Sequence, residues 1–197
     1  MKSQHLKELL YQALETEQGG IQIYEMAIRC AVNEELKEEW EEYLAQTESH
    51  EMVLRALLKT LGFDPEQETP GRAIVRHIGA SLVRAMKMAL ESADPTSAEL
   101  VATECVVLAE TKDHLNWELI GYAAEYAKHE LKKAFAKAHE EVEQEEDEHL
   151  YHTTGWSREL WLAALGLPSL LPPPEEARDV MPAMGAARAK AARAGML

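Results

Sequence analysis

The segment EEDEHLYHTTGW, residues 145–156, places a carboxylate and an imidazole three residues apart, at Glu146 and His149. Residues at this spacing lie on one face of an α-helix. The same face carries Phe135 and Val142, so the two polar groups continue an apolar series. Because a buried carboxylate is costly unless it is paired or ligates a metal, the pair predicts partners on neighbouring helices.

The composition of the chain favours an all-α protein. Of its 197 residues, 46% are hydrophobic and only 6% are aromatic, and Gly and Pro are scarce before residue 155. Ala, Leu, Glu and Lys, which are good helix formers, dominate the sequence. We therefore expect a helical bundle over residues 1–155. Residues 156–197 form a C-terminal extension, with a short helix, a Pro-rich segment and an Ala-rich basic tail.

Apolar residues recur at helical spacing in four long segments and one shorter segment. The pattern predicts helices over approximately residues 3–31, 33–62, 70–92, 96–125 and 130–153. Asn33 is the expected N-cap of the second helix, Gly62 its C-terminal stop, and Thr69 the cap of the third. Thr96 and Glu99 have the spacing of a capping box for the fourth.

Residues 96–153 contain no break signal, but a single helix of that length would measure about 87 Å. A compact domain cannot hold such a helix, so a turn is expected within residues 125–130. Beyond Gly155, a further short helix could begin with Ser157 as its cap. The basic residues near the end of the chain could touch anionic partners, although a loose tail or a docking segment is favoured.

Five side chains of metal-ligand type lie on the apolar faces of four of these helices: Glu17, His50, Glu110, Glu146 and His149. Helices joined by a tight turn are antiparallel, so residues equidistant from the turn lie at one level. The first two are equidistant from residue 33, and Glu110 and Glu146 are equidistant from residue 128. All five are therefore expected to converge in the middle of the bundle. One carboxylate from each of two helices, with a Glu-x-x-His motif from each of the other two, forms the dinuclear site of ferritin-like bundles.

With these residues in place, the chain resembles the ferritin-like superfamily, in particular bacterioferritins and rubrerythrins. Glu17 followed by Tyr24, EEDEH at 145–149 and IGYA at 120–123 are similar to bacterioferritin motifs. The helix at 70–92 and QTESHEMVLRALLKTLGFDP resemble small stress-associated ferritin-like proteins of bacteria. The resemblance covers about residues 5–153. It implies an antiparallel four-helix bundle with an extra helix in the crossover between the second and third bundle helices.

The chain departs from the family at one position. Thr47 stands where the family has a glutamate three residues before His50, and Glu48 is rotated off that face. The resemblance therefore implies three carboxylates in place of four. His114 or Asp113 could compensate, or the site could hold a single ion or a different metal. Carboxylate and imidazole ligands suit iron or manganese, one or two ions per chain, and zinc remains open.

Two functions follow from this interpretation. The first is a di-iron or other di-metal oxidoreductase that oxidises iron or acts on peroxide in oxidative-stress defence, with Tyr24 and Trp117 as redox-active neighbours or simply as packing residues. The alternative is a non-catalytic stress or scaffold bundle with a degenerate metal site. A mineral-storing cage is disfavoured by the Pro-rich tail and the extra helix.

The charge limits the partners. Lys+Arg total 20 against Asp+Glu 35, a net charge of −15, which repels nucleic acid and either attracts cations or simply solvates the surface. Cys30 and Cys105 resemble buried apolar residues in a reducing compartment, and MKSQHLKELL is no secretory signal, so a cytoplasmic location is expected. No segment is apolar enough to span a membrane. A homodimer, or a higher homo-oligomer, is expected to bury residues 156–165.

Overall fold

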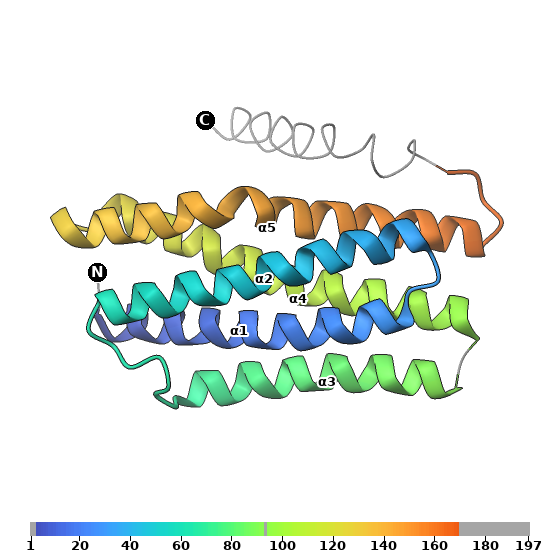
Figure 1. The fold of residues 1–197 in the computed structure, drawn as a ribbon, viewed down its shortest axis with the longest axis horizontal. Helices are drawn as coiled ribbons and strands as arrows, with labels where there is room; N and C mark the ends of the chain where they lie inside the picture. Colours follow the sequence, from blue (N-terminus) through green and yellow to red (C-terminus); the bar gives the residue numbers. More distant parts are fainter. Residues whose placement is uncertain (1–2, 93, 170–197) are drawn as a thin grey trace, which may run out of the picture.

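The computed structural model describes residues 3–92 and 94–169, and these residues form helices and no strands. The helices are α1 (Ser3–Cys30), α2 (Glu34–Thr60), α3 (Pro70–Ser92), α4 (Pro95–Tyr126) and α5 (His129–Ala164). Their axes follow the long dimension of the molecule (Figure 1). The prediction of an all-α fold is confirmed.

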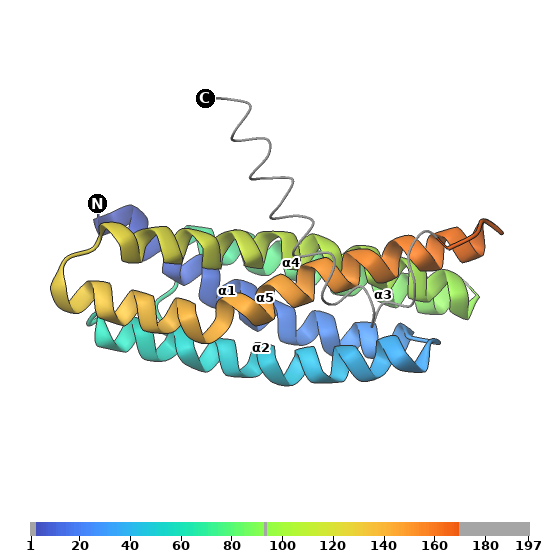
Figure 2. The ribbon, with the colours of Figure 1, turned by 90° about the horizontal axis from the view of Figure 1, so that it is seen from above.

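The chain reverses direction at each connection, so consecutive helices are antiparallel (Figures 1 and 2). Helix α1 packs against α2 and α4, and α5 packs against the same two helices, which closes a ring of four. Helix α3 lies outside this ring, against α1 and α4. It returns the chain along the bundle, so that α2 and α4 run in the same direction. Each helix of the ring is therefore antiparallel to both of its neighbours.

Three of the expected helix boundaries are confirmed. The Asn33 side chain accepts a hydrogen bond from the N–H of Leu36 at 3.1 Å and caps α2. Gly62 follows α2 with a φ of 76°, a conformation that glycine adopts without strain. The hydroxyl of Thr69 accepts from the N–H of Arg72 at 3.2 Å and caps α3.

The expected capping box at Thr96 and Glu99 is wrong. Asp94 is the N-cap of α4, and its side chain accepts from the N–H of Ser97 at 3.2 Å. The Glu99 carboxylate instead accepts from the two N–H groups of residues 32–33, at 2.7 and 2.6 Å. It therefore ties the loop between α1 and α2 to the first turn of α4.

The turn between α4 and α5 lies at residues 127–128, inside the expected range. The separate short helix beginning at Ser157 is wrong, because α5 continues through Gly155 to Ala164. Trp156 explains the continuation, since it is buried and its indole N–H donates to Glu39 at 2.7 Å. Burial of this side chain offsets the cost of about 1 kcal/mol for a glycine inside a helix. The Pro-rich connector and the basic tail, residues 170–197, lie outside the described residues.

The apolar core has two halves with a polar layer between them. One half surrounds Leu10, Leu58 and Phe135, and the other surrounds Trp40 and Val106. In each ring helix, the buried side chains between the two halves are polar. The fold therefore places charged groups at the middle of the bundle, shielded from solvent at both ends.

None of the helices in the described part of the chain combines the length and apolarity needed to cross a membrane.

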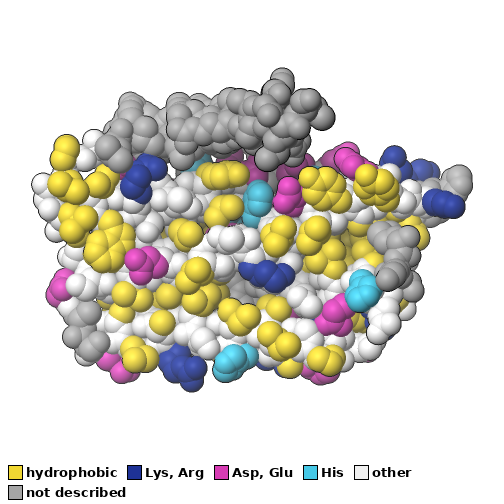
Figure 3. Space-filling view, turned by 180° about the vertical axis from the view of Figure 1, so that it is seen from behind, with side chains coloured by type: hydrophobic (Ala, Val, Ile, Leu, Met, Phe, Trp, Pro, Cys, Tyr) yellow, Lys and Arg dark blue, Asp and Glu magenta, His cyan; other side chains and the backbone are white. Residues whose placement is uncertain are grey.

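Apolar side chains are spread over the outer face of the molecule, on the side where α4 lies (Figure 3). On α4 itself, Leu108 is 62% and Leu115 is 46% exposed. At the end of α5, Trp161 is 39% and Leu165 is 64% exposed. The homodimer expected through residues 156–165 stays a prediction.

Candidate metal centre

The structure brings the five expected ligands together in the polar layer. They come from all four helices of the ring, and each is at most 3% exposed: Glu17, His50, Glu110, Glu146 and His149. Two buried groups of side chains there could hold metal ions. One consists of His50, Glu146 and His149, and the other of Glu17, Asp113 and Glu146. In each group the potential ligand atoms lie within 4.8 Å of one another, and Glu146 belongs to both.

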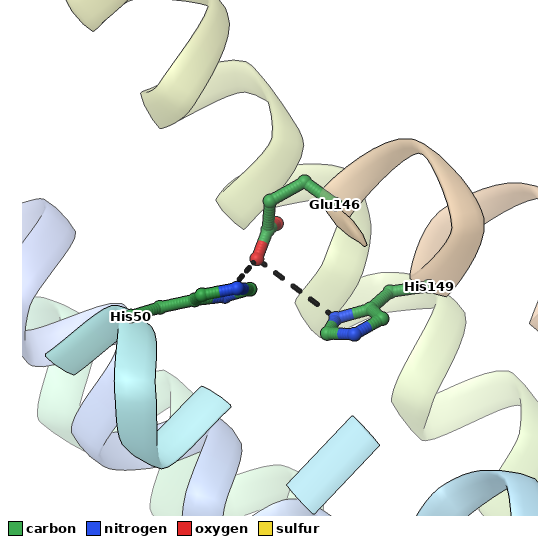
Figure 4. A group of neighbouring side chains, drawn as sticks. All are labelled: His50, Glu146 and His149. Carbon is green, nitrogen blue, oxygen red and sulfur yellow. Dashed lines mark ion pairs between the residues drawn. The ribbon is translucent and has the colours of Figure 1, made fainter. Parts of the chain in front are cut away.

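The first group converges on the carboxylate of Glu146. Its Oε1 atom lies 2.9 Å from Nδ1 of His50 and 3.9 Å from Nδ1 of His149 (Figure 4). Neither Nδ1 atom has a hydrogen-bond partner among the described residues, so the geometry of the shorter contact is not that of a hydrogen bond. The three side chains surround a common point between α2 and α5.

The outer nitrogens of both imidazoles are held by acceptors. Nε2 of His50 lies 2.7 Å from Oε2 of Glu145, and Nε2 of His149 lies 2.7 Å from Oε1 of Gln46. A carboxylate and an amide oxygen accept hydrogen bonds, so each Nε2 donates. In the neutral rings, Nδ1 therefore carries the lone pair, which is the state in which histidine ligates a metal.

The second group presents oxygen atoms. Oε1 of Glu17 accepts from the indole N–H of Trp117 at 2.7 Å, while its Oε2 has no partner among the described residues. Oδ1 of Asp113 and Oε2 of Glu146 are also unpartnered and buried. Oε2 of Glu110 is a further unpartnered oxygen, 3.7 Å from Nδ1 of His149.

Six ligand-type atoms in one layer thus lack hydrogen bonds. Unpartnered buried polar atoms are rare in folded proteins, and each needs an explanation such as an ion or a bound water. Oxygen and imidazole nitrogen atoms that converge in a buried layer without hydrogen-bond partners among the described residues fit a cation. The donor set is the one that iron, manganese or zinc accepts.

The electrostatics of the layer point the same way. Burial raises the pKa values of Glu17, Asp113 and Glu146 well above their ordinary range, and the repulsion between these carboxylates adds to the effect. A hydrogen bond from Asn116 and the Lys112 ammonium oppose this increase in the pKa of Asp113, but burial and Glu110 outweigh them. Burial lowers the pKa of His50 to about 4. Without a cation, protons therefore remain on the carboxyl groups and the imidazole is neutral.

The two residues proposed as substitutes for the missing glutamate differ in their placement. Asp113 lies in the second group and adds a fourth carboxylate to the layer. His114 lies outside the layer, 25% exposed, with Nε2 at 2.7 Å from Oδ1 of Asp147. Thr47 is buried, and its hydroxyl donates to the backbone oxygen of Tyr43 at 2.8 Å.

Aromatic side chains pack around the ligands. The rings of Tyr24 and Tyr43 lie 5.9 and 4.2 Å from the ring of His149, measured between centroids. Burial and the nearby Glu110 raise the pKa of Tyr24 well above its ordinary value, so its phenol stays protonated. Trp117 holds Glu17 in place through its indole N–H.

A second polar network, not expected from the sequence, adjoins the layer. The Tyr43 hydroxyl lies 2.8 Å from Nδ1 of His152, which lies 3.0 Å from Oε1 of Glu39. Trp156 donates to the other oxygen of Glu39 at 2.7 Å. His152 follows His149 by three residues, so extension of the helical spacing could have placed it on the same face.

The chain matches no protein-family model, no curated protein and no solved structure. Its likeness to the ferritin-like superfamily therefore rests on its own motifs.

Proposed function

We propose that this chain is a ferritin-like metal-binding protein. Its buried centre would hold two metal ions and act as an oxidoreductase, in iron oxidation or in defence against peroxide. The observation that carries the proposal is the set of six unpartnered ligand atoms among the described residues, five of which belong to residues of two overlapping groups that share Glu146.

The two groups divide the roles of the side chains. His50 and His149 would hold one ion, Glu17 and Asp113 the other, and Glu146 would contact both. A bound redox-active metal would supply the electrons exchanged with dioxygen or peroxide. The chain itself contributes four carboxylates, whose charge two divalent cations would balance. The two apolar halves of the core keep bulk water away from this charge.

Asp113 supports the dinuclear interpretation over a site that has lost its chemistry. The resemblance left three carboxylates because Thr47 replaces a glutamate. Asp113 follows Glu110 by three residues on α4, so both reach the layer from one helix. The fourth carboxylate is therefore present, although it comes from a different helix.

Metal retention tests the proposal. Protein purified without a His-tag, treated with ferrous iron under anaerobic conditions and then desalted should retain one ion for each of the two groups. Exposure to oxygen or peroxide should then produce ferric iron faster than in a protein-free control. A chain that retains no iron, manganese or zinc would be a non-catalytic bundle. Retention without turnover would leave a metal-binding protein only.

A further inference from the structure

A cavity of about 220 Å³ opens between α4 and α5 beside the polar layer. Carboxylates and imidazoles dominate its lining, which includes Glu118, His139, Glu143, Glu146, His114 and Asp147. No lysine or arginine is among the described residues that line it. The cavity therefore presents negative charge and metal-ligating atoms to solvent.

The side chains that line the cavity range from exposed to almost completely buried. The side chain of Glu143 is 61% exposed, that of Asp147 is 40% and that of His114 is 25%. Glu146, by contrast, is only 2% exposed, and one of its oxygens has no partner. The cavity thus leads from solvent to the carboxylate that both ligand groups share.

Each imidazole in the cavity wall is paired with a carboxylate. Nε2 of His114 lies 2.7 Å from Asp147, and Nδ1 of His139 lies 3.3 Å from Glu143. His139 also fits against Gly121 of α4, where an added Cβ atom would lie only 2.3 Å from its Nε2 atom. A side chain at residue 121 would displace this imidazole, so the glycine makes its position possible.

Three other cavities in the described part of the chain have none of the ligands in their linings. The cavity bounded by α1, α3 and α4 is lined mainly by apolar side chains such as Ile23 and Leu82. The groove between α2 and α5 and the one between α1 and α4 contain none of the ligands in their linings. On the α2 side of the layer, the His50 imidazole is hydrogen-bonded to the partly exposed Glu145 carboxylate, and this pair covers the centre.

We propose that the cavity between α4 and α5 is the route by which a divalent cation reaches the metal centre. The pairs His139–Glu143 and His114–Asp147 would bind the cation transiently on its way to Glu146. This inference rests on the proposed function and adds to it the direction from which the metal arrives. Negative clefts with low-dielectric walls concentrate cations and accelerate their association.

The rate of Co²⁺ loading, followed by stopped-flow absorbance of its ligand-field bands, tests the route. Glu143→Arg places a positive charge in the cavity wall, and loading should slow about tenfold or more, measured at an ionic strength where distant charges are screened. Final Co²⁺ occupancy should not change, because Glu143 is no ligand of the centre. Circular dichroism would establish that the variant is folded, as expected for an exposed position.

Glu141→Arg is the matched control. It makes the same change of charge on the same helix, but Glu141 lines the groove between α2 and α5. Loading in this variant should stay within about twofold of wild type at an ionic strength where distant charges are screened. Equal slowing by both variants would show a general field effect and would overturn the route.

Two further results separate the route from the metal centre itself. If Glu143→Arg leaves the rate of Co²⁺ loading unchanged, cations do not arrive through this cavity and the proposed route is wrong. If wild-type protein binds no Co²⁺ at equilibrium, both the proposed metal centre and the proposed route are wrong. If Glu143→Arg reaches full Co²⁺ occupancy at the wild-type rate, only the proposed route is wrong and the metal centre stands.

Discussion

Nδ1 of His50 lies 2.9 Å from Oε1 of Glu146, yet the nitrogen makes no hydrogen bond. The Nε2 atom of the same ring is held by Glu145, so the lone pair of Nδ1 faces a buried carboxylate. Two acceptors this close repel each other unless a proton or a cation lies between them. Because Glu146 belongs to both ligand groups, its removal should have a larger effect than removal of any other ligand.

The first prediction compares two ligands. Glu146→Ala should prevent binding at both positions, whereas His149→Ala should leave the Glu17–Asp113 group able to hold one ion. Elemental analysis after desalting would measure the difference. Glu141→Ala serves as an exposed control on α5 and should retain the wild-type metal content. Comparable losses in all three variants would mean that the acidic surface holds the ions.

The second prediction concerns Gln46, which accepts from Nε2 of His149 at 2.7 Å. Gln46→Ala should release the imidazole and weaken metal binding by about 10- to 100-fold without abolishing it, as for other residues that orient ligands. Competition titrations with a chromophoric chelator would give the affinity. Gln46→Glu keeps an acceptor and should bind more tightly than Gln46→Ala. Equal affinities for these two variants would contradict an orienting role.

The third prediction follows from the buried carboxyl groups. Their pKa values are raised in the folded chain, so the stability that these groups contribute to the metal-free protein is fully present below the ordinary pKa of 4.5 for Glu. As the pH rises above that value, carboxyl groups ionise in the unfolded chain first. Stability is then lost by up to about 1.4 kcal/mol per pH unit for each group.

The His50 imidazole changes the stability of the fold with pH in the opposite direction. Its pKa of about 4 lies below the ordinary 6.5, so its contribution is present above pH 6.5 and is lost as the pH falls toward 4. Three carboxyl groups outweigh one imidazole, and thermal unfolding of chelator-treated protein should show a falling Tm between pH 5 and about 8. Added Mn²⁺ or Zn²⁺ should reverse the trend, because a cation replaces the protons. A metal-free Tm that rises across this range would refute the assignment.

The fourth prediction tests the network beside the metal layer. Burial raises the pKa of Glu39, but hydrogen bonds from His152, Tyr43 and Trp156 outweigh it and hold the pKa below its ordinary value. Glu39→Gln loses the charge and at least one acceptor, which should destabilise the fold by about 1–3 kcal/mol. Urea unfolding would measure this loss. Glu38→Gln, at an exposed position, should change stability by less than about 0.5 kcal/mol.

The sequence was sufficient for features that depend on local patterns. Helix length placed the turn within residues 125–130, and it lies at 127–128. Asn33, Gly62 and Thr69 have capping roles that depend on local sequence. Local spacing predicted the wrong N-cap for α4. Asp94 caps this helix and Pro95 occupies its first turn, whereas the spacing had indicated Thr96. The continuation of α5 depends on the contact of Trp156 with Glu39, 117 residues away, which no periodicity contains.

In the candidate site, too, local spacing predicted some residues, and others depend on how the helices pack. Its five residues share the apolar faces of their helices, so spacing alone brought them together. Gln46 and Glu145 lie at the edge of those faces and contact the ligands only because α2 and α5 pack closely. Asp113 and His114 are neighbours in sequence, but a helix rotates them about 100° apart. Only the packing of α4 decides which one reaches the layer.

The last prediction exchanges the source of the fourth carboxylate. Thr47 is buried on the face of α2 that meets α1, and its Cγ2 atom would lie 3.2 Å from a Cβ atom added at Gly20. Asp113→Asn should lose the ion held by the Glu17 group, because a neutral amide replaces a carboxylate. Thr47→Glu in that background should restore the second ion, since it supplies a carboxylate on α2 at the level of the layer.

Thr47→Gln in the same background is the matched control, with the size of glutamate but no charge. It should not restore metal binding. Elemental analysis and thermal unfolding with and without Mn²⁺ would compare the three proteins. In the metal-free state, the new glutamate should lower the Tm, because an unpaired carboxylate in the core is costly or must take up a proton. If Mn²⁺ recovers neither the ion nor the Tm, Thr47 does not face the metal centre, and Asp113 is not acting in place of a glutamate there.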